Sequence, residues 1–326
     1  MADLLWEEVI LARERIAPFA HRTPFLTCAS LDRATANNVF FKGEFLQKSG
    51  SFKFRGACNT VAALTATERT RGVITHSSGN HAQALALAAR LHHARATVVI
   101  PEDAPEIKRL ATAGYGAKVV LCKPNLAARA KVTAQIVKET SAIFVSSHDD
   151  NQVIAGQGTA AAELIEDVGD LDYVLVPVGG GGLLAGTAIT ASHLLPKARV
   201  IGCEPAEADD AYRSFRSGKR VEEVSTNTIA DGLRTTLGVR NFEVIKSRVF
   251  DIVRVSEEEI IGAMRYVWER MKIVIEPSSA VAVAPLLYHH LGIEGRRIGV
   301  ILTGGNVELE PFFQAVFSNN RRKRGR

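Results

Sequence analysis

The sequence predicts an α/β fold in which parallel strands are joined by crossover helices. From residue 72 onward, short apolar runs typical of strands alternate with segments of helical periodicity, and this alternation places the strands parallel. The length of 326 residues and the hydrophobic content of 46% leave room for one large domain or two modest ones. No apolar run approaches the roughly 20 residues of a membrane span, so we expect a globular protein that does not cross a membrane.

The first part of the chain predicts a helix, a strand and a second helix. An amphipathic pattern indicates a helix over 4–16, and a strand follows at 38–44. A Ser-Gly-Ser turn precedes Lys53, which opens a helix that runs to about residue 64. Strand and helix then alternate, with elements expected at 72–76, 81–91, 96–101, 104–113, 118–121, 126–140 and 143–146.

A second series of elements begins at Gly156. It predicts a helix over 156–167, a strand over 173–178, a helix over 183–193 and a strand over 199–203. After an irregular stretch at 227–238, we expect a strand at 251–255, helices at 257–271 and 278–291, and a closing strand at 298–302. Boundaries near residues 72 and 149 predict a small domain, 72–149, inserted in a large domain formed by 1–71 and 150–320.

The net charge of +5 is concentrated at the C-terminal end. Residues 321–326 carry five positive charges, which leaves 35 basic against 35 acidic residues in the rest of the chain. We interpret 321–326 as a basic, disordered tail, because a nucleic-acid-binding segment would interleave aromatic residues. Four scattered cysteines without a C-x-x-C pair indicate reduced thiols. An acidic N-terminus without an apolar run does not resemble a signal peptide, so we expect a cytoplasmic protein.

Four consecutive glycines form the first candidate site. Gly179, Gly180, Gly181 and Gly182 follow the apolar strand and precede the helix that starts near Leu183. Such a loop presents successive backbone N–H groups at the positive end of a helix, which suits a phosphate group. Glycines also serve tight turns, and that alternative stays open for the run taken alone.

A second candidate is Lys53, within Ser51-Phe52-Lys53-Phe54-Arg55-Gly56. A lysine beside an aromatic ring at the start of a helix can be partly desolvated, which lowers the pKa of its amine and frees it to form a Schiff base. The alternative is an ordinary surface lysine. Two further polar turns, Ser77-Ser78-Gly79-Asn80-His81 and Thr303-Gly304-Gly305-Asn306, follow predicted strands. Together these strings predict a cofactor site.

The ordered motifs resemble those of the fold-type II enzymes that use pyridoxal 5′-phosphate, in particular the serine racemase and serine/threonine dehydratase branch with its 3-hydroxyaspartate ammonia-lyases. The resemblance covers nearly the whole chain, since Thr23-Pro24, Ile229-Ala230-Asp231-Gly232 and Glu276-Pro277 complete the series. It implies two open, twisted, mostly parallel sheets flanked by helices, with a small domain inserted in a large one.

The resemblance also assigns roles to single residues around the cofactor. It implies that Lys53 forms the Schiff base and removes the α-proton, and that Phe52 packs on the pyridine ring. Asn80 would bind the ring hydroxyl, the four glycine amides would bind the phosphate, and Glu276 would belong to the same cofactor site. Thr303 would face the ring nitrogen; a hydroxyl there makes the ring a weaker electron sink than a carboxylate would.

For the substrate, the resemblance points to the turn before the helix that starts near His81. Ser77, Ser78, Gly79, Asn80 and His81 would bind the α-carboxylate, although a plain helix cap remains an alternative. Ser78 distinguishes branches of the family, since racemase-like members carry Ser there as the acid or base on the second face, whereas dehydratases usually carry Ala. Arg129, with His81, would contact a second carboxylate; Arg129 is otherwise a surface residue.

A divalent cation is implied by Glu204-Pro205-Ala206-Glu207-Ala208-Asp209-Asp210, which matches the segment where serine racemases bind one. The carboxylates of Glu204 and Asp210 and the carbonyl of Ala208 would suit Mg²⁺, Ca²⁺ or Mn²⁺. The alternative is a solvated acidic loop. Animal racemases also bind ATP through residues like Lys48, Gln83 and Asn306, but Cys28-Ala29 replaces their serine pair, which puts nucleotide activation in doubt.

The predicted function is β-elimination from a small β-hydroxy amino acid (serine, threonine or 3-hydroxyaspartate) to a keto acid and ammonia, with a companion serine- or aspartate-type racemase activity. A primary serine racemase, a cysteine synthase-like β-replacement enzyme and a non-catalytic metabolite-binding protein are the alternatives. A nicotinamide oxidoreductase is less favoured, because G-x-G-x-x-G does not follow the first strand. We expect a small-molecule amino-acid substrate, no nucleic-acid or membrane partner, and a homodimer.

Overall fold

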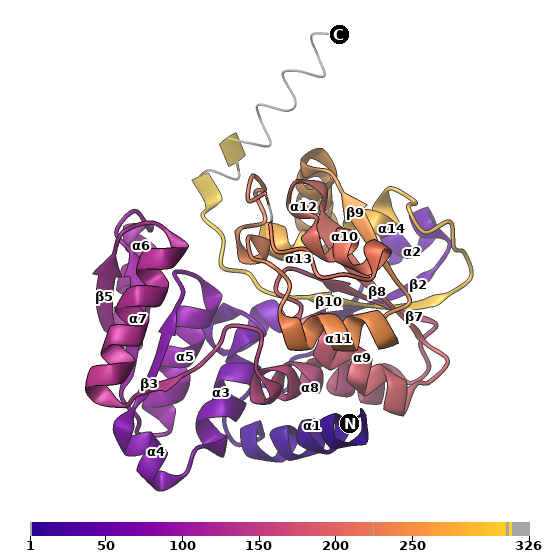
Figure 1. Cartoon of the computed structure of the whole chain (residues 1–326). Helices are drawn as coiled ribbons and strands as arrows, with labels where there is room; N and C mark the ends of the chain where they lie inside the picture. Colours follow the sequence, from indigo (N-terminus) through magenta and orange to yellow (C-terminus); the bar gives the residue numbers. More distant parts are fainter. Residues whose placement is uncertain (1, 224, 311–312, 315–326) are drawn as a thin grey trace.

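The computed structural model describes residues 2–223, 225–310 and 313–314, and the chain is arranged around two separate sheets (Figure 1). The segment 321–326, predicted to be a disordered tail, lies outside the described residues. None of the described helices has the length and apolarity needed to span a bilayer.

The larger sheet has six strands in the order β1-β2-β10-β7-β8-β9, and all neighbours are parallel except β1 and β2. Its strands come from both ends of the chain: β1 (Phe25–Thr27), β2 (Asn38–Gly43), β7 (Tyr173–Pro177), β8 (Arg199–Pro205), β9 (Asp251–Val255) and β10 (Arg297–Leu302). Because β10 pairs with β2 on one side and β7 on the other, segments far apart in sequence end side by side at the same edge.

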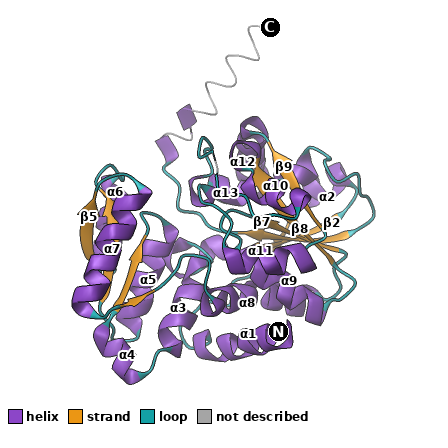
Figure 2. Ribbon diagram, viewed as in Figure 1, coloured by secondary structure: helices purple, strands orange, loops and turns teal. Residues whose placement is uncertain are grey.

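Helices cover both faces of this sheet (Figure 2). One face packs against α1 (Ala2–Ile16), α8 (Asn151–Val168), α9 (Gly182–Leu194) and α11 (Val239–Arg248). The other packs against α2 (Ala29–Thr35), α12 (Glu257–Met271), α13 (Pro277–Ala280) and α14 (Ala284–Leu287), while α10 (Asp210–Ser217) contacts β9. Four short 3-10 turns connect elements: η1 (Glu44–Leu46), η2 (Lys48–Gly50), η3 (Ala206–Ala208) and η4 (Asp231–Leu233).

The smaller sheet has four parallel strands in the order β5-β4-β3-β6. The strands are β3 (Val73–His76), β4 (Ala96–Pro101), β5 (Lys118–Cys122) and β6 (Ile143–Phe144). The core on one face contains side chains of α3 (Lys53–Ala63) and α5 (Asn80–Leu91), and the core on the other is partly covered by α7 (Leu126–Thr140). Helices α4 (Ala66–Arg71) and α6 (Glu106–Gly114) complete this part.

The predicted α/β fold with parallel sheets is confirmed, and several element boundaries were wrong. Helix α8 begins at Asn151, before the predicted start at Gly156, because the Asp150 carboxylate accepts hydrogen bonds from the amides of Gln152 and Val153 and caps it. The helix predicted at 278–291 is two short helices separated by a turn. Strand β1 and helices α2, α4, α10 and α11 were not predicted at all.

Candidate active site

The Lys53 and Thr303 motifs lie side by side, because β10 ends where α3 begins. The Phe52 amide donates to the Thr303 carbonyl at 2.9 Å, and the Gly305 amide donates to the Gly50 carbonyl at 3.0 Å. An antiparallel bridge joins Ser51 to Gly304 between these two hydrogen bonds. Two strings separated by about 250 positions in the sequence therefore form one wall of a site.

Lys53 is held by main chain and partly withdrawn from solvent. Its Nζ donates to the Ser147 carbonyl at 2.7 Å and lies 5.1 Å from the centre of the Phe52 ring. Burial lowers the pKa of the amine to about 8, against the opposing attraction of Glu276. A useful fraction of the amine is therefore neutral near physiological pH, the form that can attack a carbonyl or accept a proton.

The four glycines form a buried loop between β7 and the first turn of α9. Gly181 has a φ of +88°, a conformation that side chains disfavour. Among the described residues, none accepts a hydrogen bond from the amides of Gly179, Gly180, Gly181 or Gly182. Unpaired, buried N–H groups at the positive end of a 13-residue helix require an external acceptor, and a phosphate ester fits them.

The turn from Ser77 to His81 precedes α5 and remains partly open. Ser77, Ser78 and Gly79 are partly exposed, and a methyl group placed on Gly79 would meet open space. No described residue pairs with the Ser78 hydroxyl, whereas His81 is buried with Nε2 3.4 Å from the Val145 carbonyl. Burial lowers the pKa of His81 to about 3, so this side chain is neutral and brings no positive charge to a carboxylate.

Asn80 and Glu276 connect the small sheet to the large one. The Asn80 Nδ2 donates to both carboxylate oxygens of Glu276, at 3.1 and 2.9 Å, and its Oδ1 accepts from Asn306 Nδ2 at 2.9 Å. Burial raises the pKa of Glu276 to about 8, and the Asn80 hydrogen bonds act in the opposite direction. The sequence predicted Asn80 and Glu276 at the site but did not predict Asn306 as their partner there.

Thr303 presents a hydroxyl that is already part of a short network. Its Oγ1 lies 2.9 Å from Ser279 Oγ, and Ser279 Oγ in turn accepts from the Gly304 amide at 2.8 Å. Both side chains are buried at the end of β10, next to the wall that carries Lys53. The sequence did not indicate a role for Ser279, apart from its place shortly after Glu276-Pro277.

Arg129 lies in the first turn of α7, the helix that packs on the face of the small sheet opposite α5. It lies near enough to His76, the residue before Ser77, to contribute, after burial, to a lowered pKa of that imidazole. The buried Nε of Arg129 has no hydrogen-bond partner among the described residues. No contact joins Arg129 to Lys53 or to the glycine loop, so its role in binding a substrate stays a prediction.

The expected cation ligands lie close together but are largely occupied by backbone groups. Glu204 is buried and accepts from the Ala211 and Tyr212 amides at 2.9 and 2.7 Å, while Asp210 Oδ2 accepts from the Leu237 amide at 2.7 Å. Asp210 Oδ1 is buried without a partner. Within the described part of the chain, no group of three His, Cys, Asp or Glu side chains is arranged to hold a metal.

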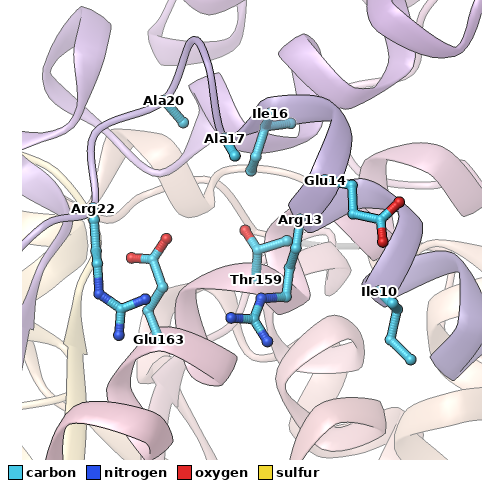
Figure 3. A pocket seen from close by; sticks show the side chains of 9 residues that line it. All are labelled: Ile10, Arg13, Glu14, Ile16, Ala17, Ala20, Arg22, Thr159 and Glu163. Atoms are coloured by element: carbon cyan, nitrogen blue, oxygen red, sulfur yellow. The ribbon is translucent and has the colours of Figure 1, made fainter.

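A separate hollow of about 470 Å³ lies between α1 and α8 (Figure 3). The arginines that line it are already paired, since Arg13 and Arg22 both bind Glu166. Glu163 on its floor accepts hydrogen bonds from Arg55 and Lys42. None of the residues lining it belongs to the predicted site, so the hollow does not compete with the residues around Lys53 as the candidate active site.

Comparisons with known proteins assign the chain to a family. The model of the family described as "Pyridoxal-phosphate dependent enzyme" matches residues 16–304. A serine racemase of Dictyostelium discoideum is 46% identical over 95% of this chain and 97% of its own length. A beta-hydroxyaspartate dehydratase of Paracoccus denitrificans (strain Pd 1222) is 44% identical over 94% of this chain and 97% of its own length. The crystal structure of the D. discoideum serine racemase superposes with a TM-score of 0.90, at 46% identity, covering 93% of this chain and 98% of that one.

Proposed function

We propose a function for this chain from the premise that it belongs to the family of pyridoxal-phosphate-dependent enzymes. It eliminates water from a small β-hydroxy amino acid (serine, threonine or 3-hydroxyaspartate), and the released enamine takes water up again as it hydrolyses to a keto acid and ammonia. It racemises serine or aspartate as a companion activity. The names of its relatives, a serine racemase and a beta-hydroxyaspartate dehydratase, support both reactions. The observation that carries the proposal is the desolvated Lys53 amine, held on Ser147, in one site with unpaired helix-terminal amides.

The residues that would hold the cofactor are Lys53, Phe52 and the amides of the glycine loop, with Asn80, Glu276 and Thr303 around the ring. When bound, pyridoxal phosphate supplies an electron-withdrawing ring that stabilises negative charge at the α-carbon of an amino acid. Thr303 shares its hydroxyl with Ser279, so this chain offers a neutral hydrogen-bonding group, not a carboxylate, at that position. Such a group favours rapid loss of a β-hydroxyl over long-lived charge on the ring.

The chain's own groups account for the remaining steps. The turn at the N-terminus of the 12-residue helix α5 would bind the α-carboxylate through backbone amides. Lys53, with its pKa lowered to about 8, would accept the α-proton on one face. Ser78, with an unpaired hydroxyl on the substrate turn, would donate a proton from the opposite face, which inverts the α-carbon. The same two residues therefore allow elimination and racemisation to share one site.

Replacing Lys53 by Ala tests the assignment directly. We expect the purified variant to lose the yellow absorbance of bound cofactor and to release no keto acid from L-serine, L-threonine or L-threo-3-hydroxyaspartate, because no other amine can take its place. Lys53→Arg, which keeps the charge but not a nucleophilic amine, should be equally inactive. Retained turnover in either variant would refute the proposal, and a wild-type protein inert toward the D and L forms of all three amino acids would favour a metabolite-binding role.

A primary serine racemase is the second candidate, and the Ser78 hydroxyl favours it. The two candidates differ in the ratio of inverted amino acid to keto acid formed from L-serine. We expect keto acid in excess from L-threo-3-hydroxyaspartate; inversion that exceeds elimination for each substrate would make racemisation the main activity.

We also propose that Glu204, Asp210 and the Ala208 carbonyl bind a divalent cation. Support comes from the free, buried Oδ1 of Asp210 and from an all-oxygen donor set, which Mg²⁺, Ca²⁺ and Mn²⁺ prefer. Bound cation stabilises the folded state by mass action, so we expect Mg²⁺ to raise and EDTA to lower the melting temperature. Asp210→Asn should abolish the Mg²⁺ effect, and an unchanged response in that variant would remove Asp210 from the ligand set.

A cytoplasmic homodimer completes the proposal. The exposed apolar side chains of Ile107 and Leu110 on α6 (65% and 63% exposed) support a contact with another chain. Light scattering of the purified protein measures its mass in solution, and a single-chain mass at micromolar concentration would contradict the dimer; fractionation of cells that express the protein locates it.

A further inference from the structure

We propose that His148 and Asn241 are positioning residues for the cofactor phosphate, which clamp the glycine loop to the segment that holds Lys53. The inference rests on the proposed function, because it takes the ligand of the loop to be a phosphate ester. Neither residue belongs to a motif that the sequence singled out. They lie in the connection before α8 and in the first turn of α11, two places that the fold brings against the same loop.

The His148 ring fills the space that a side chain at position 180 would need, so only glycine fits there. A methyl group built on Gly180 would lie 2.3 Å from His148 Cγ and 2.6 Å from its Nδ1, which no real side chain tolerates. A methyl group on Gly182 would lie 2.8 Å from the His148 carbonyl oxygen. The imidazole therefore packs directly on the loop backbone and limits how far Gly180 can move.

Asn241 ties the same two segments together by hydrogen bonds. Its side chain is fully buried, and Nδ2 donates to the Gly180 carbonyl at 2.6 Å and to the His148 carbonyl at 3.0 Å. The Gly238 amide donates to the same Gly180 carbonyl at 3.1 Å. Because the Asn241 side chain and the Gly238 amide both bind the Gly180 carbonyl, the peptide planes of the loop are held in one orientation. Their N–H groups stay free for an anion.

The clamp also reaches Lys53 through one peptide unit. The carbonyl that accepts from Lys53 belongs to Ser147, and Ser147 Oγ lies 2.9 Å from His148 Nδ1. The next residue, Asp149, accepts from the amides of Val239 and Arg240 at 3.1 and 2.9 Å, which anchors the segment to the start of α11. The three residues 147–149 thus set the separation between the amine and the loop.

The charge state of His148 is consistent with a purely steric and hydrogen-bonding role. Burial, followed by the nearby Lys53, lowers the pKa of this imidazole to about 4. The ring is therefore neutral near physiological pH in the structure described. Its contacts with Gly180 and Gly182 act on the shape of the loop, which predicts a selective effect on phosphorylated ligands.

The experiment compares the binding of pyridoxal 5′-phosphate with that of pyridoxal, which carries the same aldehyde and no phosphate, to cofactor-free protein. For His148→Ala and Asn241→Ala, we expect the affinity for pyridoxal phosphate to fall about tenfold or more, the size of one or two lost positioning hydrogen bonds. The affinity for pyridoxal should change less than twofold. His92→Ala is the control, because His92 is also partly buried but packs on Phe19 and Cys58, and we expect it to change neither affinity.

A double substitution tests the steric part independently. Gly180→Ala should weaken pyridoxal phosphate binding through its clash with His148, and adding His148→Ala should restore part of that loss. Equal losses for both ligands, or strictly additive effects of the two substitutions, would overturn the inference and leave His148 a residue of general packing. A wild-type chain that binds neither ligand would instead refute the proposed function. Melting temperatures of all variants separate unfolding from weakened binding.

Discussion

At the scale of single residues, burial decides what the ionisable groups of the site can do. In water the pKa values of lysine and glutamate side chains are far apart. Desolvation lowers that of Lys53 and raises that of Glu276, and both reach about 8. The sequence predicted the lowered pKa of Lys53 from its aromatic neighbour and its place at a helix start. It gave no reason to expect a raised pKa at Glu276, because that shift comes from burial, which the tertiary packing around this carboxyl creates.

Ser78 allows the sharpest prediction at this scale. Ser78→Ala removes the hydroxyl from the second face, so we expect racemisation of L-serine to fall by about a hundredfold or more, the typical contribution of a positioned acid or base. Elimination from L-threo-3-hydroxyaspartate should stay within a few-fold, since Lys53 is untouched. Chiral chromatography and a keto-acid assay measure the two products. Ser77→Ala, on the same turn, is the control and should lower both rates alike; a parallel loss in the Ser78 variant would count against its catalytic role.

At the scale of elements, small residues set how closely the helices approach. Helices α3 and α8 cross where Gly56 meets Gly156: a methyl group on Gly156 would lie 2.6 Å from Gly56 Cα and 2.7 Å from the Arg55 carbonyl. Both contacts are with backbone, which cannot turn aside as a side chain can. This crossing fixes the position of α3, whose first residue is Lys53, relative to the large sheet.

Gly156→Ala should therefore destabilise the fold in spite of the higher helix propensity of alanine. We expect a loss of about 1–3 kcal/mol in the free energy of unfolding, the usual cost of overpacking, measured by urea denaturation. Gly114→Ala is the matched control, since Gly114 is also helical and a methyl group there meets nothing. That variant should be unchanged or more stable by up to about 1 kcal/mol. Equal stabilities for the two variants would show that α3 and α8 separate easily.

At the scale of the whole molecule, the site lies between the part that carries the small sheet and the part that carries the large one. Side-chain contacts between described residues cross this boundary near the substrate turn: Asn80 binds Glu276 and Asn306, and Lys108 Nζ lies 2.7 Å from Asp231 Oδ2. We propose that the block 72–149 moves as a small domain relative to the large one, and that the Asn80–Glu276 and Lys108–Asp231 contacts hold its closed position. The Glu276 carboxyl of the first contact is buried, whereas both side chains of the second are partly exposed to solvent.

Asp231→Asn tests this closure. A partly exposed ion pair contributes at most about 1 kcal/mol, so we expect kcat/KM for the amino-acid substrate to fall two- to fivefold, mainly through a higher KM. Added salt should reduce the wild-type value toward that of the variant, because it screens the same pair. Lys108→Met combined with Asp231→Asn should cause no further loss. A salt dependence that persists unchanged in the Asp231 variant would assign the effect to other charges.

The sequence by itself determined the parallel α/β fold and the motif residues, because both depend on local signals. Alternating strand and helix patterns indicate parallel strands, and Lys53 and the four glycines stand in short strings that indicate their chemistry locally. The role of Ser78 came from the family resemblance. Short elements such as α10 and α11 were not predicted, because helices of 8 and 10 residues depend on tertiary packing more than on their own helix propensity.

Only the tertiary structure decided which distant groups complete the site. Ser147, His148 and Asn241 belong to no motif, and they reach Lys53 and Gly180 through carbonyl oxygens, amide groups and van der Waals contact. Asn306 ends the Thr303 motif, but the motif did not indicate that its side chain binds Asn80. Every residue has a main-chain carbonyl, so a hydrogen bond to that carbonyl does not restrict which residue occupies the position. The sequence pattern therefore could not predict these contacts. The fold creates them by ending separate strands at one edge and packing α11 against the turn between β7 and α9.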